Sequence, residues 1–306
     1  MSKVVSYIRG KAGVMVNEAF FAPFASNQLR LFRGAVGVAL IITLLSWLQS
    51  FRWFFAPDGY VPLSLAGSLG KYTASYLHLF NYEALSGLPF LYAGYILLFA
   101  AAICLVVGKY EKVAAPVAYV LFLSFMGRNP ALSYGGTDVL QFLLLGVVLL
   151  SLPGKKQVEK WPIVLIQFQF AVLYLSAAIS KMQVPEWFNG TKMFFGMSDP
   201  TFSYINPTFL LSVPALLAFI TWYGFMSEIG FTFLIWSKGT RRFALAMVVL
   251  LHVGIALSMN VHLFSEMMLL GFTALLTERE STWLLERLRA AKTGVVSVVR
   301  RSQRKV

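Results

Sequence analysis

The sequence predicts an all-α bundle of about eight membrane-spanning helices with both termini on the cytoplasmic side. Of the 306 residues, 58% are hydrophobic and only 13% are charged, and the mean hydropathy is +0.70, whereas soluble domains are about half apolar and a quarter charged. The apolar residues fall into eight runs, and most basic residues lie on one side of them. With no internal repeat and no low-complexity segment, the chain is expected to form one helical domain.

Each run approaches the length that crosses a bilayer core, about 20 residues of helix for about 30 Å. The runs cover residues 34–51, 88–107, 113–126, 138–152, 161–180, 209–236, 243–259 and 261–276. A proline, Pro214, can shift the start of the sixth run. We therefore expect a basic interfacial segment at 1–33, a transmembrane domain at 34–276 and a basic interfacial tail at 277–306.

The net charge of +13, from 26 Lys+Arg against 13 Asp+Glu, predicts an orientation. Lys and Arg in short loops mark the cytoplasmic side. All but five of the basic residues lie on one side of the runs, and the five exceptions are Arg52, Lys71, Arg128, Lys181 and Lys192. Since no base-stacking or groove-reading motif accompanies the charge, we expect no nucleic-acid partner.

The two ends of the chain interleave basic with apolar residues, over 11–30 and again over 282–304. This pattern is typical of helices that lie on anionic lipid, although a flexible tail remains the alternative for the last ten residues. No small-residue cleavage pattern follows the first run, so we expect an uncleaved anchor. The expected location is the bacterial inner (plasma) membrane, or the endoplasmic reticulum membrane in a eukaryote.

Metal and nucleotide sites are not expected. The single cysteine, Cys104, excludes an intrachain disulfide, and the three histidines, His78, His252 and His262, form no zinc or di-iron motif. No phosphate-binding loop is present. Gly34 and Gly37 are better explained by close packing of helices.

Two ionisable residues, Glu228 and His252, lie inside predicted spans, where charge is costly. Each is ten residues from the basic end of its run, so at 1.5 Å per residue both lie about 15 Å deep. A carboxylate–imidazole hydrogen bond between neighbouring helices is therefore expected. It would either orient a proton shuttle or simply satisfy two buried polar groups.

A second polar layer is expected at the outer membrane surface. Its members could line an outward-facing cavity, or they could be helix caps and snorkelling side chains. They are Arg128 in the outer loop before the fourth run, Asp138, Lys181, Asn260, His262 and Glu266.

A segment in the fifth run resembles the HTTM family, which includes the membrane domain of vitamin K-dependent γ-glutamyl carboxylase. The segment runs from Tyr174 to Lys181 and Met182, and Trp187 and Gly190 follow it. The resemblance extends over residues 30–276 and includes Arg128, Asp138, Glu228, His252 and Asn260 in the expected order.

The resemblance implies chemistry on reduced vitamin K or a menaquinol-type quinone, with Lys181 as the base that deprotonates it. An amine in a poorly hydrated pocket loses its proton more easily, which suits this role. The candidate catalytic residues are Lys181, His252 and Glu228. The candidate cofactor-binding residues are Tyr174, Trp187, Asn260, Asp138 and Arg128. Here Met182 replaces the family's leucine, and no large lumenal portion follows residue 276, so carboxylation of a substrate is less expected than quinone chemistry or peptide maturation at the outer face.

Three classes of function stay open. The first is a carboxylase-like enzyme or maturation factor with a peptide or protein substrate at the non-cytoplasmic face. The second is a non-enzymatic membrane subunit that binds partner proteins. The third is a transporter, which would be expected to show repeats or broken helices.

Overall fold

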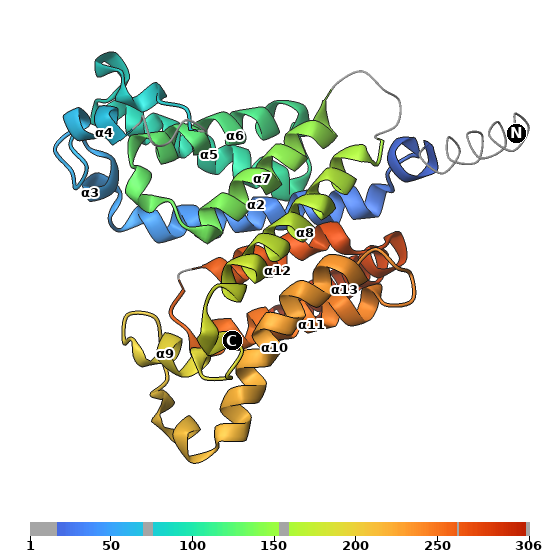
Figure 1. Cartoon of the computed structure of the whole chain (residues 1–306). Helices are drawn as coiled ribbons and strands as arrows, with labels where there is room; N and C mark the ends of the chain where they lie inside the picture. The colour runs from blue at the N-terminus through green and yellow to red at the C-terminus, as the bar shows by residue number, and fades with distance from the viewer. Residues whose placement is uncertain (1–16, 70–75, 153–158, 262, 304–306) are drawn as a thin grey trace, which may run out of the picture.

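The computed structural model describes residues 17–69, 76–152, 159–261 and 263–303, and its regular elements are helices (Figure 1). In these ranges the only extended pairing is an isolated bridge between Pro23 and Glu159. The all-α prediction is therefore confirmed.

The longer helices are α2 (Ser26–Leu48), α5 (Leu88–Val107), α6 (Glu111–Arg128), α7 (Gly135–Ser151), α8 (Trp161–Met182), α10 (Pro214–Leu234), α11 (Arg241–Ser258) and α13 (Glu278–Gln303). Shorter helices join them: η1 (Asn17–Phe21), α3 (Phe51–Phe55), α4 (Leu63–Leu69), η3 (Leu79–Asn81), η4 (Glu83–Leu85), η5 (Pro130–Leu132), η6 (Pro185–Trp187), α9 (Lys192–Ser198), η7 (Pro207–Ser212), α12 (Phe264–Gly271) and η8 (Phe272–Leu275).

Five of the described helices are long and apolar enough to cross a membrane, namely α2, α5, α8, α10 and α11. The chain is therefore a multi-pass membrane protein in its architecture. The apolar helices α7 and α12 with η8 are shorter. The count of eight spans and the orientation of the termini stay predictions.

Prolines and glycines explain several helix boundaries. Pro162 and Pro214 stand in the first turns of α8 and α10, where a missing N–H costs nothing. The sixth run thus begins at Pro214, and the residues just before it form the separate helix η7. Gly108 ends α5 with a φ of 78°, a conformation that favours glycine.

The two ends of the chain differ in part from the expected boundaries. Helix α2 begins at Ser26, so Arg30 and Arg33 lie inside it and not in a preceding surface segment. Residues 1–16, about half of the predicted N-terminal interfacial segment, lie outside the described residues. At the other end α13 continues to Gln303, which favours a helix over a flexible tail.

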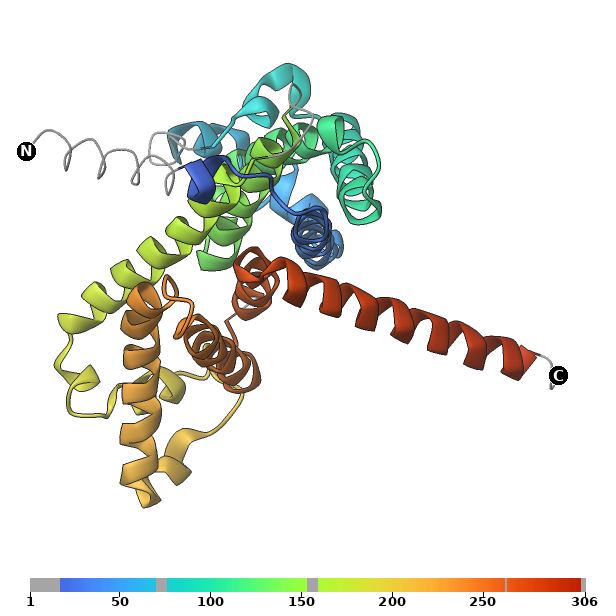
Figure 2. The same cartoon turned by 90° about the vertical axis from the view of Figure 1, so that its right-hand side faces the viewer.

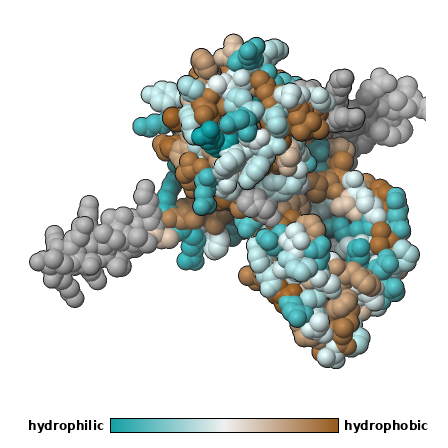
Figure 3. Space-filling view, turned by 90° about the vertical axis from the view of Figure 1, so that its left-hand side faces the viewer, coloured by the Kyte–Doolittle hydropathy of each residue, from teal (hydrophilic) through white to brown (hydrophobic). Residues whose placement is uncertain are grey.

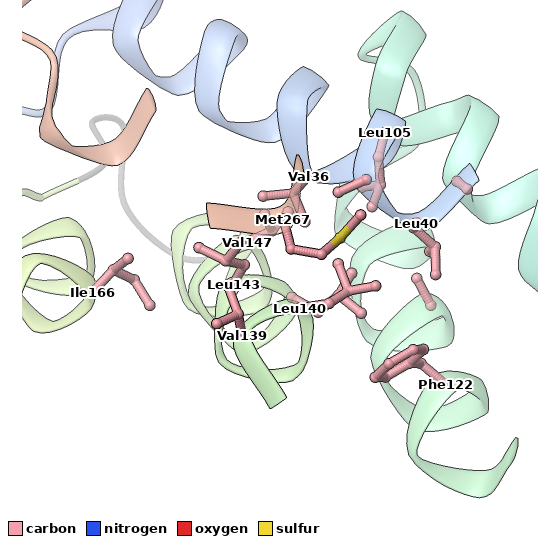
Figure 4. Packing of buried hydrophobic residues seen from close by; sticks show 14 of the residues in the cluster. Val36, Leu40, Leu105, Phe122, Val139, Leu140, Leu143, Val147, Ile166 and Met267 are labelled. Atoms are coloured by element: carbon pink, nitrogen blue, oxygen red, sulfur yellow. The ribbon is translucent and has the colours of Figure 1, made fainter. Parts of the chain in front are cut away.

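Helix α2 is the centre of the bundle. Of its most apolar stretch 61% is buried, against 17% to 39% for the other four candidate spans. Figure 4 shows its Val36 and Leu40 among apolar side chains of α5, α6, α7 and α12, such as Leu105, Phe122 and Met267. The buried side chains of this helix form a large part of the main core.

Helices α2 and α5 approach each other closely at Gly37. A Cβ at this position would lie 3.0 Å from the Ala102 carbonyl oxygen and 2.8 Å from Cγ2 of Val106. The close-packing prediction for Gly37 is confirmed, whereas a Cβ on Gly34 would meet only one atom, at 4.0 Å. Small residues at such positions are how membrane helices gain van der Waals contact.

The starts of several helices gather on one side of the bundle. Arg33 near the start of α2 forms an ion pair with Glu111 at the start of α6 (3.5 Å). The Lys160 N–H, just before α8, donates to the Ala22 carbonyl just before α2 (3.1 Å). Arg241 at the start of α11 pairs with Glu280 at the start of α13. Helices that begin on the same side are what an alternating membrane topology requires.

Helices α8, α10 and α11 form a second part of the bundle, beside α12 (Figures 1 and 2). Many large apolar side chains of this part are exposed, among them Phe219, Leu250 and Leu257. The face in Figure 3 likewise shows apolar patches next to polar ones. Surfaces of this kind suit contact with lipid.

Candidate functional site

The centre of the candidate site is an ion pair between Lys181, in the last turn of α8, and Glu228 on α10. The Lys181 Nζ lies 2.9 Å and 2.7 Å from the two carboxylate oxygens of Glu228. Only 22% of the lysine side chain and 13% of the glutamate side chain are exposed. Because desolvating one of these charges alone is costly, each group depends on the other.

The pair forms because α8 and α10 run antiparallel in contact. Residue numbers increase along α10 while those of the partners on α8 decrease. Glu228 pairs with Lys181, the Phe231 ring packs against Tyr174, and the Thr232 hydroxyl donates to the Ala171 carbonyl. Side chains on a helix point back toward its N-terminus. Lys181 therefore reaches from the end of α8 into the space between the two helices.

Trp187 covers the lysine from the following segment. The Lys181 ammonium lies 5.1 Å from the centroid of the Trp187 ring, which is within cation–π range. The turn between them is short, since the Val184 N–H donates to the Lys181 carbonyl and Pro185 begins η6. The two motif residues Lys181 and Trp187 thus lie in contact in the folded chain.

An open hollow of about 480 Å³ adjoins this turn. Three apolar residues, a glutamine and an asparagine line it. The lining residues are Met182, Gln183, Pro185, Phe188 and Asn189. A flat ligand with an apolar ring and a few polar oxygens would find both kinds of contact there.

Tyr174 and His252 form a second polar pair, deeper in the bundle. The Tyr174 hydroxyl lies 2.8 Å from Nε2 of His252, and each residue is only 2% exposed. The other ring nitrogen of His252, Nδ1, is buried and has no hydrogen-bond partner in the described part of the chain. The pair lies within an aromatic cluster whose further members are Phe231, Phe264 and Phe272.

The predicted hydrogen bond between Glu228 and His252 is wrong. The carboxylate of Glu228 pairs with Lys181, and the imidazole of His252 pairs with Tyr174. Equal depth in the membrane does not determine which helix faces a side chain, because depth says nothing of rotation about the helix axis. Both true partners come from α8.

Asp138 belongs to a separate cluster at the start of α7. Its Oδ1 accepts hydrogen bonds from the hydroxyls of Tyr76 (3.3 Å) and Ser133 (3.2 Å). Next to it, burial and then the negative charge of Glu266 raise the pKa of Tyr134 to about 12, which keeps this phenol neutral. Tyr76 and Ser133 are partners that the sequence did not point to.

Arg128 is a structural residue in this fold and not part of an exposed loop. It is the last residue of α6 and is fully buried. Its guanidinium donates to the backbone carbonyls of Val61 (2.8 Å) and Ala56 (2.5 Å). It thereby fixes the segment after α3.

The side chain of Asn260 forms hydrogen bonds with residues other than Lys181 and Glu228. Its side-chain oxygen accepts from the Tyr204 hydroxyl (2.8 Å), and its amide donates to the Thr201 carbonyl (3.3 Å). These bonds join the loop after α11 to the loop before η7. His262 lies outside the described residues. Among the described residues no group of three His, Cys, Asp or Glu side chains is placed to hold a metal ion.

Comparisons with known proteins relate part of the chain to the HTTM family. Residues 141–280 match the HTTM domain. The sporulation-delaying protein SdpB of Bacillus subtilis (strain 168) is 27% identical over 155 residues, which cover 43% of this chain and 48% of that protein. The match thus spans about half the length of this relative. No solved structure matches the chain. The domain match contains both polar pairs and excludes Arg128 and Asp138.

Proposed function

We propose that this multi-pass membrane protein, which carries an HTTM domain over residues 141–280, moves a proton from a weakly acidic hydroxyl ligand to the Lys181–Glu228 pair. The observation that carries the proposal is the pair itself. A lysine and a glutamate share one partly buried space beside an open hollow, and the aromatic ring of Trp187 covers the lysine. Paired, partly buried ionisable groups next to a hollow are typical of functional sites.

The proton transfer follows from the charges of the pair. The proposed transfer starts from the ion pair, with an ammonium on Lys181 and a carboxylate on Glu228. When Glu228 takes the proton of the ammonium, Lys181 becomes a neutral amine that can accept a proton from a bound hydroxyl. The ammonium that re-forms then faces the oxyanion of the ligand, which replaces the Glu228 carboxylate as its counter-charge. Total charge is conserved throughout, so no net charge has to enter the site.

A hydroquinone fits the lining of the hollow. Met182, Pro185 and Phe188 offer apolar contact to a ring, and Gln183 and Asn189 offer amides to its oxygens. When bound, a reduced quinone of the vitamin K or menaquinol type supplies a phenolic proton and two reducing electrons. The residues of the chain bind and orient the ring, and Lys181 and Glu228 hold the proton.

In this proposal the chain crosses the plasma membrane of a bacterium eight times, with both termini in the cytoplasm. The gathering of the starts of α2, α6, α8 and α11 on one side supports the alternation. Lys181 stands at the opposite end of α8, hence on the non-cytoplasmic side. A peptide or protein substrate, if one is used, would meet the site there.

The test compares menaquinol oxidation by the purified protein in nanodiscs, with dioxygen as oxidant. We expect Lys181→Met to lower the rate at least about tenfold, since general-base catalysis contributes 10²-fold or more. Lys192→Met, which removes another lysine of the outer segments, should leave the rate unchanged. Equal rates for the wild type and Lys181→Met would remove Lys181 from any role as a base.

One observation favours a non-enzymatic subunit as the second candidate. The ion pair also joins α8 to α10, so its groups have a structural task without any ligand. If Lys181→Met and His252→Ala fold normally but lose a protein that co-purifies with the wild type, with no turnover in any of them, this second candidate replaces the first.

A further inference from the structure

Helix α13 leaves the bundle across the direction of the central helix. Figure 1 shows α2 lengthwise, and the view turned by 90° in Figure 2 shows α2 end-on while α13 extends lengthwise away from the body. Helix α13 has 26 residues, so it is about 39 Å long at 1.5 Å per residue. Because α2 is a candidate membrane span, a helix that crosses its direction runs along the membrane plane.

Hydrogen bonds hold the first turns of α13 at the membrane boundary. The Gln28 N–H at the start of α2 donates to Glu278 (3.1 Å), and the Asn27 amide donates to the Thr282 hydroxyl (3.0 Å). The Glu280 carboxylate accepts a hydrogen bond from the Arg241 guanidinium at the start of α11. Helix α13 therefore begins at the level where α2 and α11 enter the membrane.

The side on which α13 lies is also the basic side of the protein. Lys109 and Lys238 lie in connections there, and Lys112 and Arg242 lie in the first turns of α6 and α11. The sequence of α13 contains six basic and three acidic residues, and two of the acidic ones, Glu278 and Glu280, are bonded to α2 and α11. The remaining charge of the helix is strongly positive.

The described part of α13 exposes apolar side chains next to arginines. Trp283 is 57% and Leu288 is 55% exposed, and the Arg287 guanidinium lies 5.4 Å from the Trp283 ring centroid. At 100° per residue, Leu284 and Leu288 share one face, and Glu286 lies on the opposite face. A helix with one apolar face and flanking arginines is suited to the boundary between lipid headgroups and acyl chains.

We infer that α13 lies on the leaflet at the start of α2, with Leu288 in the acyl region and its arginines bound to anionic phospholipid headgroups. The positive charge selects anionic over zwitterionic lipid. This inference is independent of the chemistry proposed for Lys181.

The test places a nitroxide label at either of two exposed positions of α13 in a Cys104→Ser background. Leu288→Cys reports the apolar face, and Glu286→Cys is the matched position on the polar face. The protein is placed in nanodiscs of phosphatidylcholine alone or with phosphatidylglycerol. Collision of the label with apolar dioxygen and with a water-soluble nickel complex is then measured.

With phosphatidylglycerol present, we expect the label at 288 to meet dioxygen preferentially and the label at 286 to meet the nickel complex. Arg287→Gln with Arg289→Gln should lower the equilibrium constant for binding of the helix to the lipid surface by about 30-fold, since each basic residue near an anionic surface contributes about 1 kcal/mol. The same change of charge at Lys109 and Lys112 should leave it unaltered. Equal access of nickel to both labels in anionic nanodiscs would overturn the inference. Protection of both labels from both reagents would also overturn it, since it would indicate a protein partner such as a second copy.

Discussion

The ammonium of Lys181 lies 2.7 Å from a carboxylate oxygen of Glu228, although 47 positions separate the two residues in the chain. The contact joins the end of α8 to α10, and Trp187 closes it from one side. Lys181 therefore differs from Lys192, another lysine of the outer segments, which has no such carboxylate among its described contacts.

Removal of one partner of the ion pair should destabilise the fold more than removal of both. We expect Lys181→Met or Glu228→Leu alone to lower the free energy of unfolding by about 3 kcal/mol, because each leaves a poorly hydrated charge without its partner. The double variant should lose much less than the sum. Denaturant unfolding in detergent micelles measures the cycle. Additive effects of the two substitutions would show that the pair carries no coupling.

The buried Tyr174–His252 hydrogen bond should contribute to stability. Tyr174→Phe leaves both ring nitrogens of His252 without a partner, so we expect a loss of about 1–3 kcal/mol in the free energy of unfolding. Tyr60→Phe, at an exposed tyrosine, is the matched control and should change stability little. A Tyr174→Phe variant as stable as this control would speak against the bond.

The close approach of α2 and α5 should make Gly37 intolerant of a side chain. We expect Gly37→Ala to cost about 1–3 kcal/mol, because the added methyl meets the backbone of Ala102. Gly34→Ala, three residues earlier on the same helix, has room for the methyl and gains helix propensity of up to about 1 kcal/mol. Thermal unfolding of the two variants should therefore shift in opposite directions.

The anchor of α13 at Glu280 should make stability depend on pH. Partial burial raises the pKa of Glu280, but hydrogen bonds from Thr277 and the charge of Arg241 outweigh it and hold the pKa below the usual 4.5. A carboxyl with a lowered pKa stabilises the fold above pH 4.5, and this contribution disappears as the pH falls through the value in the folded state.

We therefore expect Glu280→Gln to lower stability at neutral pH and to flatten the loss of stability below pH 4.5. Unfolding of the wild type and the variant between neutral and acidic pH measures this difference. Glu286→Gln, at an exposed position of the same helix, serves as the control. If the wild type and Glu280→Gln show the same pH profile, the anchor contributes nothing.

Much of the fold could be predicted from the sequence, because hydropathy indicates which segments form apolar helices and proline positions indicate where some of them begin. The start of the sixth run at Pro214 is one example. The start of α2 was missed, since Arg30 and Arg33 look like surface residues. In the structure Arg33 is buried against the Leu105 carbonyl (3.2 Å) and paired with Glu111.

The site could be predicted only where its parts are close in the chain. Lys181 and Trp187 are six residues apart, so one turn joins them. The partners of Glu228 and His252 depend on how each helix is rotated about its own axis. The positions of the two residues in the sequence do not determine this rotation. The same holds for Arg128, whose carbonyl partners lie in a segment with no regular pattern. For Glu280, the spacing Thr277-x-x-Glu280 was a usable signal of a capping box.

We expect Glu228 to receive a proton when Lys181 deprotonates a bound hydroxyl. Infrared difference spectroscopy of the protein in nanodiscs, before and after addition of menaquinol without oxidant, tests it most directly. We predict a new carbonyl band of a protonated carboxylic acid in the wild type and in Lys192→Met. It should be absent in Lys181→Met and in Glu228→Gln. A wild-type spectrum without this band, or a band that persists in Glu228→Gln, would contradict the account.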